Sequence, residues 1–203
     1  MRLPAVLSLV VLLAPAVGRS ELVPCRRPAD AARIAAALAR IRRSVDPCGE
    51  SPQVVALLDR LERSARVRYE ICTDTDAARN VFEHAARLDE PGRIVWNPDL
   101  RSELERGCDG DASRPALRDP TASLLHEIAH AVHDSEGLNA GAFEGEAVRI
   151  ENVYRRAAGL CQRTRYGDEV LRLASCDAGT CRCPGLMPAS SAAAGVDAAD
   201  SAQ

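Results

Sequence analysis

The run His126-Glu127-Ile128-Ala129-His130 carries the side-chain types of a hydrolytic zinc site. Two histidines four residues apart lie one turn apart on the same face of an α-helix, so both can ligate one metal ion. Zinc lowers the pKa of a bound water and polarises a substrate carbonyl, and Glu127 can accept that water's proton. We therefore predict Zn²⁺ on His126 and His130, with Glu127 as the general base for peptide-bond hydrolysis.

A catalytic zinc site needs a third protein ligand and one open position. His133 is a poor candidate, because seven residues of helix place it about 10.5 Å along the axis from His126. We expect His133 to lie beside the site, to face substrate or to be exposed. The next predicted helix offers Glu144 and Glu151, which share one face, whereas Glu146 points elsewhere. Helix geometry alone leaves Glu144 and Glu151 as alternatives.

Two predicted helices carry these side chains. Asp119 as N-cap and Pro120 in the first turn predict a helix over 120–135. A loop over 138–142 joins it to a second helix over 143–158. Because the loop is short, the second helix can fold back against the first and bring a carboxylate to the two histidines.

The remaining elements form a scaffold around these two helices. Apolar spacing and turn residues predict helices over 30–45, 51–61 and 76–88, and strands over 67–71 and 93–96. The expected fold class is therefore α+β: a mainly helical domain with a small antiparallel strand region.

The two ends of the chain differ in composition from the middle. Residues 1–18 combine a positive start, an apolar run and small residues at a cleavage point, which predicts a signal peptide rather than a buried helix. Residues 187–203 are rich in Ala, Ser, Asp and Gly, which is typical of a disordered tail. The domain is then expected over residues 19–186. The chain has no second long apolar stretch, so we expect no membrane-spanning segment.

The formal net charge is −3, and charged residues make up 27% of the chain. No excess of Lys and Arg is available to neutralise phosphates, so the sequence argues against a nucleic-acid partner.

Eight cysteines follow the predicted leader. An even count in an exported chain favours up to four disulfides, and the sequence does not choose among the 105 possible pairings of eight cysteines. A zinc knuckle on Cys176, Cys181 and Cys183 is the alternative, but it lacks a CxxC pair and a nearby histidine. We expect a disulfide-stapled protein that is secreted or periplasmic.

Beyond the 126–131 segment, further residues follow a recognisable pattern. They are Ile94–Pro98, Glu144, Ala147-Val148, Glu151-Asn152, Arg155, Gly159-Leu160 and Arg163–Gly167. With these pieces, residues 93–167 resemble the zinc metallopeptidases found among injected bacterial effectors, the NleD-like family. They resemble clostridial neurotoxin light chains more distantly.

The resemblance implies a zincin-like domain of the gluzincin type and a role for each matching residue. Glu144 would be the third zinc ligand, and Glu151 would be an outer carboxylate that holds Arg163. Arg163 and Tyr166 would stabilise the oxyanion, a role that suits a cation and a phenol donor. The leader and the cysteines depart from effectors that act in a host cytosol, so the family's substrate does not carry over.

Two functions from different classes remain. The first is an exported zinc metalloendopeptidase that acts on a protein or peptide substrate. The second is an exported, disulfide-rich binding or structural protein whose zinc site is degenerate or structural. Glu127 favours the first, because a structural site has no use for a general base.

Overall fold

The computed structural model describes residues 22–25, 28–63, 69–77, 79–83, 91–102, 117–138, 143–166, 169–170, 175–177 and 180–182 of the 203. Within them the helices are α1 (Pro28–Arg43), α2 (Ser51–Arg63), α3 (Pro120–Ser135) and α4 (Glu144–Ala157). The strands are β1 (Leu22–Pro24), β2 (Tyr69–Thr73), β3 (Val81–Glu83), β4 (Gly92–Trp96), β5 (Arg165–Tyr166), β6 (Glu169–Val170), β7 (Ser175–Asp177) and β8 (Thr180–Arg182). The predicted leader and tail lie outside the described residues.

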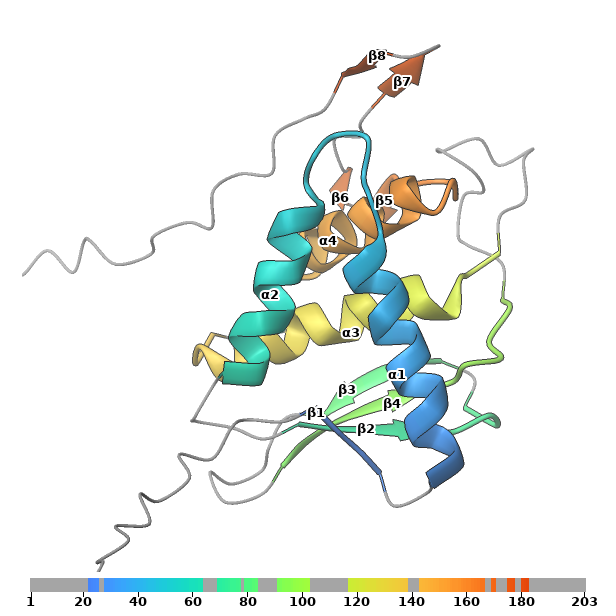
Figure 1. Cartoon of the computed structure of the whole chain (residues 1–203), viewed down its shortest axis with the longest axis vertical. Helices are drawn as coiled ribbons and strands as arrows, with labels where there is room; N and C mark the ends of the chain where they lie inside the picture. Colours follow the sequence, from blue (N-terminus) through green and yellow to red (C-terminus); the bar gives the residue numbers. More distant parts are fainter. Residues whose placement is uncertain are drawn as a thin grey trace, which may run out of the picture.

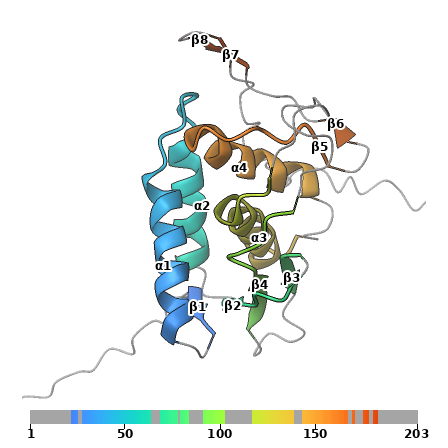
Figure 2. The ribbon, with the colours of Figure 1, turned by 90° about the vertical axis from the view of Figure 1, so that its right-hand side faces the viewer.

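Helix α3 is the central element of the fold. It contacts the sheet through β3 and β4, and it contacts α1, α2 and α4 on its other sides. Figure 1 and Figure 2 show α3 lying between the sheet and α4, with α1 and α2 packed along one flank. Because nearly every position of α3 is covered by a neighbour, its polar side chains face other elements of the protein.

The helix boundaries agree closely with the sequence prediction. Asp119 caps α3 by accepting a hydrogen bond from the backbone N–H of Ala122 at 2.9 Å, and Pro120 occupies the first turn. Gly137 and Gly159 lie two residues beyond the last residues of α3 and α4, and their positive φ angles of 78° and 67° are readily adopted by glycine. The α+β class is confirmed by these helices together with the sheet.

The predicted antiparallel strand region is wrong in its pairing. The order of the main sheet is β1-β2-β4-β3, with β1 parallel to β2 and β2 parallel to β4, so within this sheet only β3 pairs antiparallel. The separate β5–β6 and β7–β8 pairs are antiparallel. Strand β1 has no counterpart among the strands that the sequence predicts. Both α1 and α2 lie between β1 and β2 in the chain, and parallel strands need a long crossover connection of this kind.

The predicted helix over 76–88 is also wrong where the structure describes it. Residues 81–83 form edge strand β3, with Val81 opposite Val95 and Phe82 opposite Ile94. β-branched and aromatic side chains suit this pairing, and tertiary contact with β4 overrides the local helical pattern. Residues 84–88 lie outside the described residues.

The end of β4 is tied to the start of α3. The indole Nε1 of buried Trp96 donates a hydrogen bond to the Pro120 carbonyl at 2.8 Å. This bond fixes the helix that carries the two histidines against the strand beside it.

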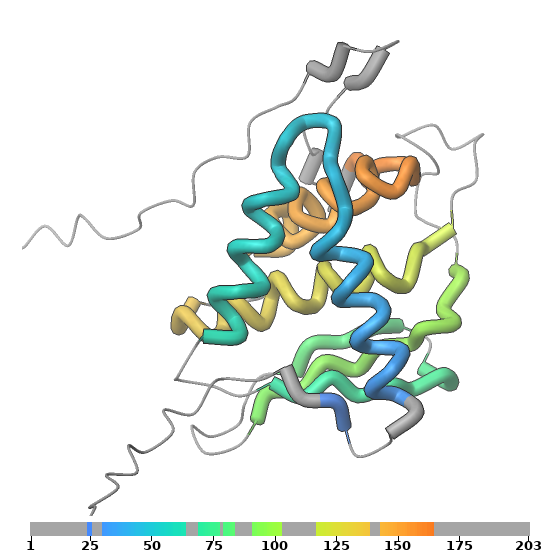
Figure 3. Tube along the Cα trace, viewed as in Figure 1, coloured from blue at the N-terminus to red at the C-terminus, as the bar shows by residue number. Residues whose placement is uncertain are grey.

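The turn between α1 and α2 is tied to the end of α4. Arg156 donates to Asp46 at 2.8 and 3.1 Å and pairs with Glu50. All three are largely buried, so this ion-pair cluster lies inside the protein and joins residues more than 100 positions apart. Figure 3 shows the turn approaching α4.

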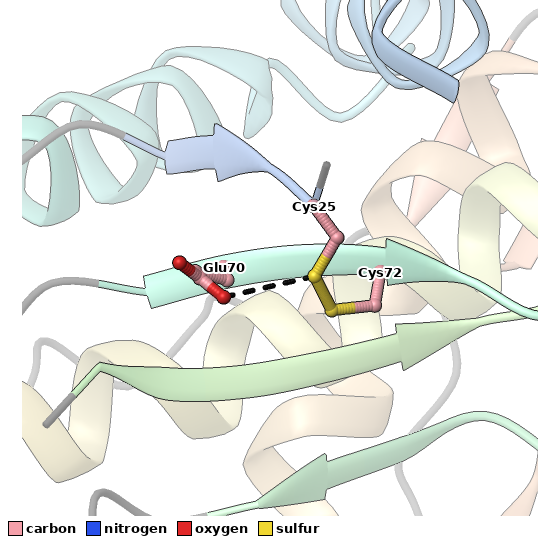
Figure 4. A group of neighbouring side chains, drawn as sticks. All are labelled: Cys25, Glu70 and Cys72. Carbon is pink, nitrogen blue, oxygen red and sulfur yellow. Dashed lines mark hydrogen bonds between the residues drawn. A yellow bond between two sulfur atoms is a disulfide. The ribbon is translucent and has the colours of Figure 1, made fainter. Parts of the chain in front are cut away.

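Disulfides hold further parts of the fold together. Cys25, just after β1, is bonded to Cys72 of β2, as Figure 4 shows. Cys48 and Cys161 are also disulfide-bonded, so no cysteine side chain that the structure describes is free. Cys176 and Cys181 lie opposite each other in the β7–β8 pair, and Cys183, the third residue of the alternative zinc knuckle, lies outside the described residues.

In the part of the chain that the structure describes, no helix is long and apolar enough to cross a membrane.

The position of the Tyr69 ring leaves no room for a side chain at Gly92. A Cβ added at Gly92 would lie 2.6 Å from two ring atoms of Tyr69, and that ring is held by a 2.8 Å hydrogen bond to Asp134. We expect Gly92→Ala to lower the free energy of unfolding by about 1–3 kcal/mol, measured by urea denaturation. In a Tyr69→Val background, the same change should cost much less. An equal loss in both backgrounds would contradict this explanation.

Candidate functional site

His126 and His130 lie on the face of α3 that meets α4. Their rings are almost fully buried, their centroids are 4.8 Å apart, and the two Nε2 atoms approach to 3.1 Å. One helical turn separates the residues, as their spacing predicts. Phe82 of β3 lies against His130, with ring centroids 6.3 Å apart, so the sheet edge covers one side of the pair.

Glu144 brings a carboxylate to the two histidines. It is the first residue of α4, and its Oε2 atom lies 3.2 Å from Nε2 of His126 and 3.1 Å from Nε2 of His130. These three atoms form a group that can hold a metal ion. The Glu144 side chain is 27% exposed, whereas the histidine side chains are under 10% exposed, so the group opens to solvent on the glutamate side.

The spacing of the three atoms fits a tetrahedral metal ion. Metal bonds of about 2.0–2.1 Å, at tetrahedral angles, place neighbouring ligand atoms about 3.3 Å apart. The observed separations are 3.1, 3.1 and 3.2 Å. Three ligands of this kind leave the fourth position open, which is the arrangement of a catalytic site.

The charge of the group also fits a cation. Burial disfavours the charged form of His126, but the nearby carboxylates of Glu144 and Glu151 outweigh burial and raise its pKa to about 9. Two carboxylates thus stabilise positive charge at this imidazole.

Glu151 lies on the other side of the His126 ring. Its Oε2 atom is 3.4 Å from Nδ1 of His126 and 2.8 Å from a guanidinium nitrogen of Arg163. Burial alone would raise the pKa of Glu151, but Arg163, His126 and Arg155 together lower it to about 2. Glu151 is therefore an ionised carboxylate that orients an imidazole, which is how ligating histidines are commonly held.

Glu127 is largely withdrawn from water beside the histidines. Burial raises its pKa to about 6; nearby Glu144 and Glu151 act in the same direction, against His126. A carboxylate with a pKa near the working pH can both accept and return a proton.

Arg163 is held in place through its backbone as well as its side chain. Its N–H donates to Oδ1 of Asn152, and its carbonyl accepts from Nδ2 of the same side chain, both at 2.8 Å. Asn152 thus makes the helix–loop hydrogen bonds that its residue type favours. Tyr166 lies three residues further on, in β5, and its role in oxyanion stabilisation stays a prediction.

His133 lies outside the metal-holding group. It is buried between α3 and α4, with its ring 4.6 Å from that of Phe143 and its Nε2 atom 3.5 Å from Glu146. The expectation that it could be exposed is therefore wrong. Its contacts instead help to fix the start of α4, where Glu144 is located.

Cys25, Glu70 and Cys72 form a second close group of potential ligand atoms. Figure 4 shows Oε2 of Glu70 beside Sγ of Cys25, at 3.7 Å. Because the two sulfur atoms are bonded to each other, they are not thiolates and do not ligate a metal in this form.

The sequence analysis assigns no role to two residues of the site, Phe82 and Arg155. The local pattern places Phe82 in a helix, whereas its contact with His130 depends on the pairing of β3 with β4. Arg155 is fully buried and contacts Glu151, its neighbour one turn earlier on α4. The i,i+4 spacing of a glutamate and an arginine is a signal that could have indicated this pair.

Comparison with protein-family models, with curated proteins and with solved structures finds no match to the chain.

Glu144 and Glu151 of α4 should differ in their effect on metal binding. With Zn²⁺ or Co²⁺ as the probe, Glu144→Gln should weaken binding by more than about 100-fold, because a neutral amide replaces the anionic carboxylate that lies beside both histidines. Glu151→Gln should keep the metal with a loss of about 10–100-fold, the usual effect of an outer partner.

Chelator competition measures both affinities, and Glu146→Gln is the matched control on the same helix. Metal lost in Glu151→Gln but kept in Glu144→Gln would exchange the two assignments.

Proposed function

We propose that the chain is an exported zinc-dependent metalloendopeptidase with a zincin-like active-site domain. The observation that carries the proposal is the convergence of His126, His130 and Glu144 on one point, beside Glu127. An imidazole–imidazole–carboxylate set with an open position suits catalytic zinc.

Each residue of the site has a defined task in this proposal. When bound, zinc would polarise the scissile carbonyl and acidify the attacking water. Glu127 accepts a proton from that water and returns it to the leaving amine. Arg163 is the cation that stabilises negative charge developing on the carbonyl oxygen, and Tyr166 is proposed as a second donor.

Glu151 and Asn152 prepare this arrangement before substrate arrives. Glu151 holds both the imidazole of His126 and the guanidinium of Arg163, while Asn152 fixes the Arg163 backbone. Fixed dipoles and charges need little reorganisation during the reaction, which is the main source of electrostatic catalysis.

The decisive experiment combines metal analysis with cleavage profiling. The purified chain should hold one zinc ion, and a chelator should abolish proteolysis of a denatured proteome. Zinc without any cleavage would instead support the alternative, a binding or structural protein with a structural site.

The variant Glu127→Gln tests the role of the general base independently of the metal ligands. We expect this variant to keep zinc and fold but to lose about 10²–10⁴-fold in kcat, because only the proton acceptor is removed. Glu136→Gln, at the C-terminal end of α3, is the control and should keep full activity. Substantial turnover by Glu127→Gln would overturn the assigned mechanism.

Export is proposed from the leader-like residues 1–18 and from the disulfides. Protein recovered from an oxidising compartment should begin between residues 17 and 19, and an alkylating reagent should find no free thiol at Cys25, Cys48, Cys72 or Cys161. Peptide mass spectrometry measures both. Reactive thiols at these positions would contradict export.

A further inference from the structure

Arg155 is a charged side chain that neither metal binding nor the proposed reaction accounts for. It is only 1% exposed, and moving a guanidinium out of water is costly unless strong partners compensate. Burial accordingly lowers the pKa of Arg155, and the Glu151 carboxylate opposes that effect. The burial of this cation therefore has to be explained by the groups that it contacts.

The hydrogen-bond partners of Arg155 are two parts of the candidate active site. One guanidinium nitrogen lies 3.4 Å from Oε1 of Glu151, and Nε donates to the carbonyl of Cys161. The opposite oxygen of Glu151 faces His126 and Arg163. Arg155 thus restrains the carboxylate on the side away from these two residues.

The contact with Cys161 restrains the other partner of the same ion pair. Arg163 follows Cys161 by two residues, and the backbone N–H of Leu160 donates to the Arg155 carbonyl at 2.7 Å. Arg155 therefore holds the segment that carries Arg163 through its side chain and its backbone. Arg155 thus contacts both Glu151 and the 161–163 segment, whose Arg163 pairs with Glu151.

The fork shape of the guanidinium explains why an arginine is present. Its nitrogens point in fixed, different directions, so one side chain can donate to a carboxylate and a carbonyl together. A lysine ammonium on a flexible stem is less suited to hold both.

We propose that Arg155 is a positioning residue of the active site, which sets the orientation of His126 through Glu151 and the place of Arg163 through Cys161. The part of this inference that concerns kcat rests on the proposed function. The part that concerns zinc affinity does not, because metal binding is measured without any activity.

The test compares Arg155→Met and Arg155→Lys with the wild-type full chain. Chelator competition measures the zinc affinity, and thermal unfolding measures the stability. The values of kcat and KM are measured on a peptide that the wild type cleaves. We expect Arg155→Met to lose about 10–100-fold in zinc affinity and in kcat, with KM little changed, since outer partners of a ligand have effects of this size. Arg155→Lys should recover part of both losses.

Asp46→Asn is the matched control for stability. It weakens the buried pair with Arg156, the next residue of α4, without touching Glu151 or Cys161. It should lower the unfolding temperature while zinc affinity and kcat stay at wild-type values.

Three outcomes would overturn the proposal. The first is a zinc affinity of Arg155→Met equal to that of the wild type. The second is a loss of zinc affinity and kcat in Asp46→Asn as large as the loss in Arg155→Met, when the two variants are equally stable. The third is wild-type zinc affinity and kcat in Arg155→Lys. If Arg155→Met does not fold, Arg155→Lys and the control still decide between positioning and simple stability. A wild-type chain without peptidase activity would remove the proposed function but leave the zinc-affinity comparison intact.

Discussion

The structure of the site depends on one imidazole held between two carboxylates. Glu144 meets Nε2 of His126, and Glu151 meets Nδ1 of the same ring from the other side. Both glutamates belong to one face of α4, seven residues apart, so α4 must lie along α3 for both contacts to form. The packing of these two helices therefore decides which atoms can meet a metal and which can only orient a ligand.

The rest of the fold fixes that helix pair. Strands β3 and β4 and helices α1 and α2 cover α3, and the Trp96 indole ties β4 to its first turn. Helix α4 is held near its start by the contacts of His133 with Phe143 and Glu146, and at its end by Arg156 with Asp46 and Glu50. These contacts hold α4 against the rest of the fold, and the carboxylates of Glu144 and Glu151 then take their positions from their own contacts with the histidines and Arg163.

The interface between α3 and α4 is rich in charge, and this has a cost for stability. His126, Glu151 and Arg155 are all buried, and buried ion pairs often stabilise a protein less than apolar residues of the same size would. Their arrangement is better explained by what it positions. Glu151 contacts His126 of the metal-holding group and also Arg163. Arg155 in turn contacts Glu151. Such local exceptions to an apolar interior are expected at functional sites.

The sequence by itself determined the helices that carry the site and the chemistry of its central motif. Caps at Asp119 and Gly159 and the spacing of His126 and His130 depend on local backbone geometry, which short-range patterns encode. It left Glu144 and Glu151 equivalent, because two residues on one helix face look alike until a neighbour is placed beside them. The parallel pairing of β2 with β4, the strand at Phe82 and the burial of His133 and Arg155 came only from tertiary structure. These features depend on contacts between segments far apart in the chain, and no local pattern of residues specifies them.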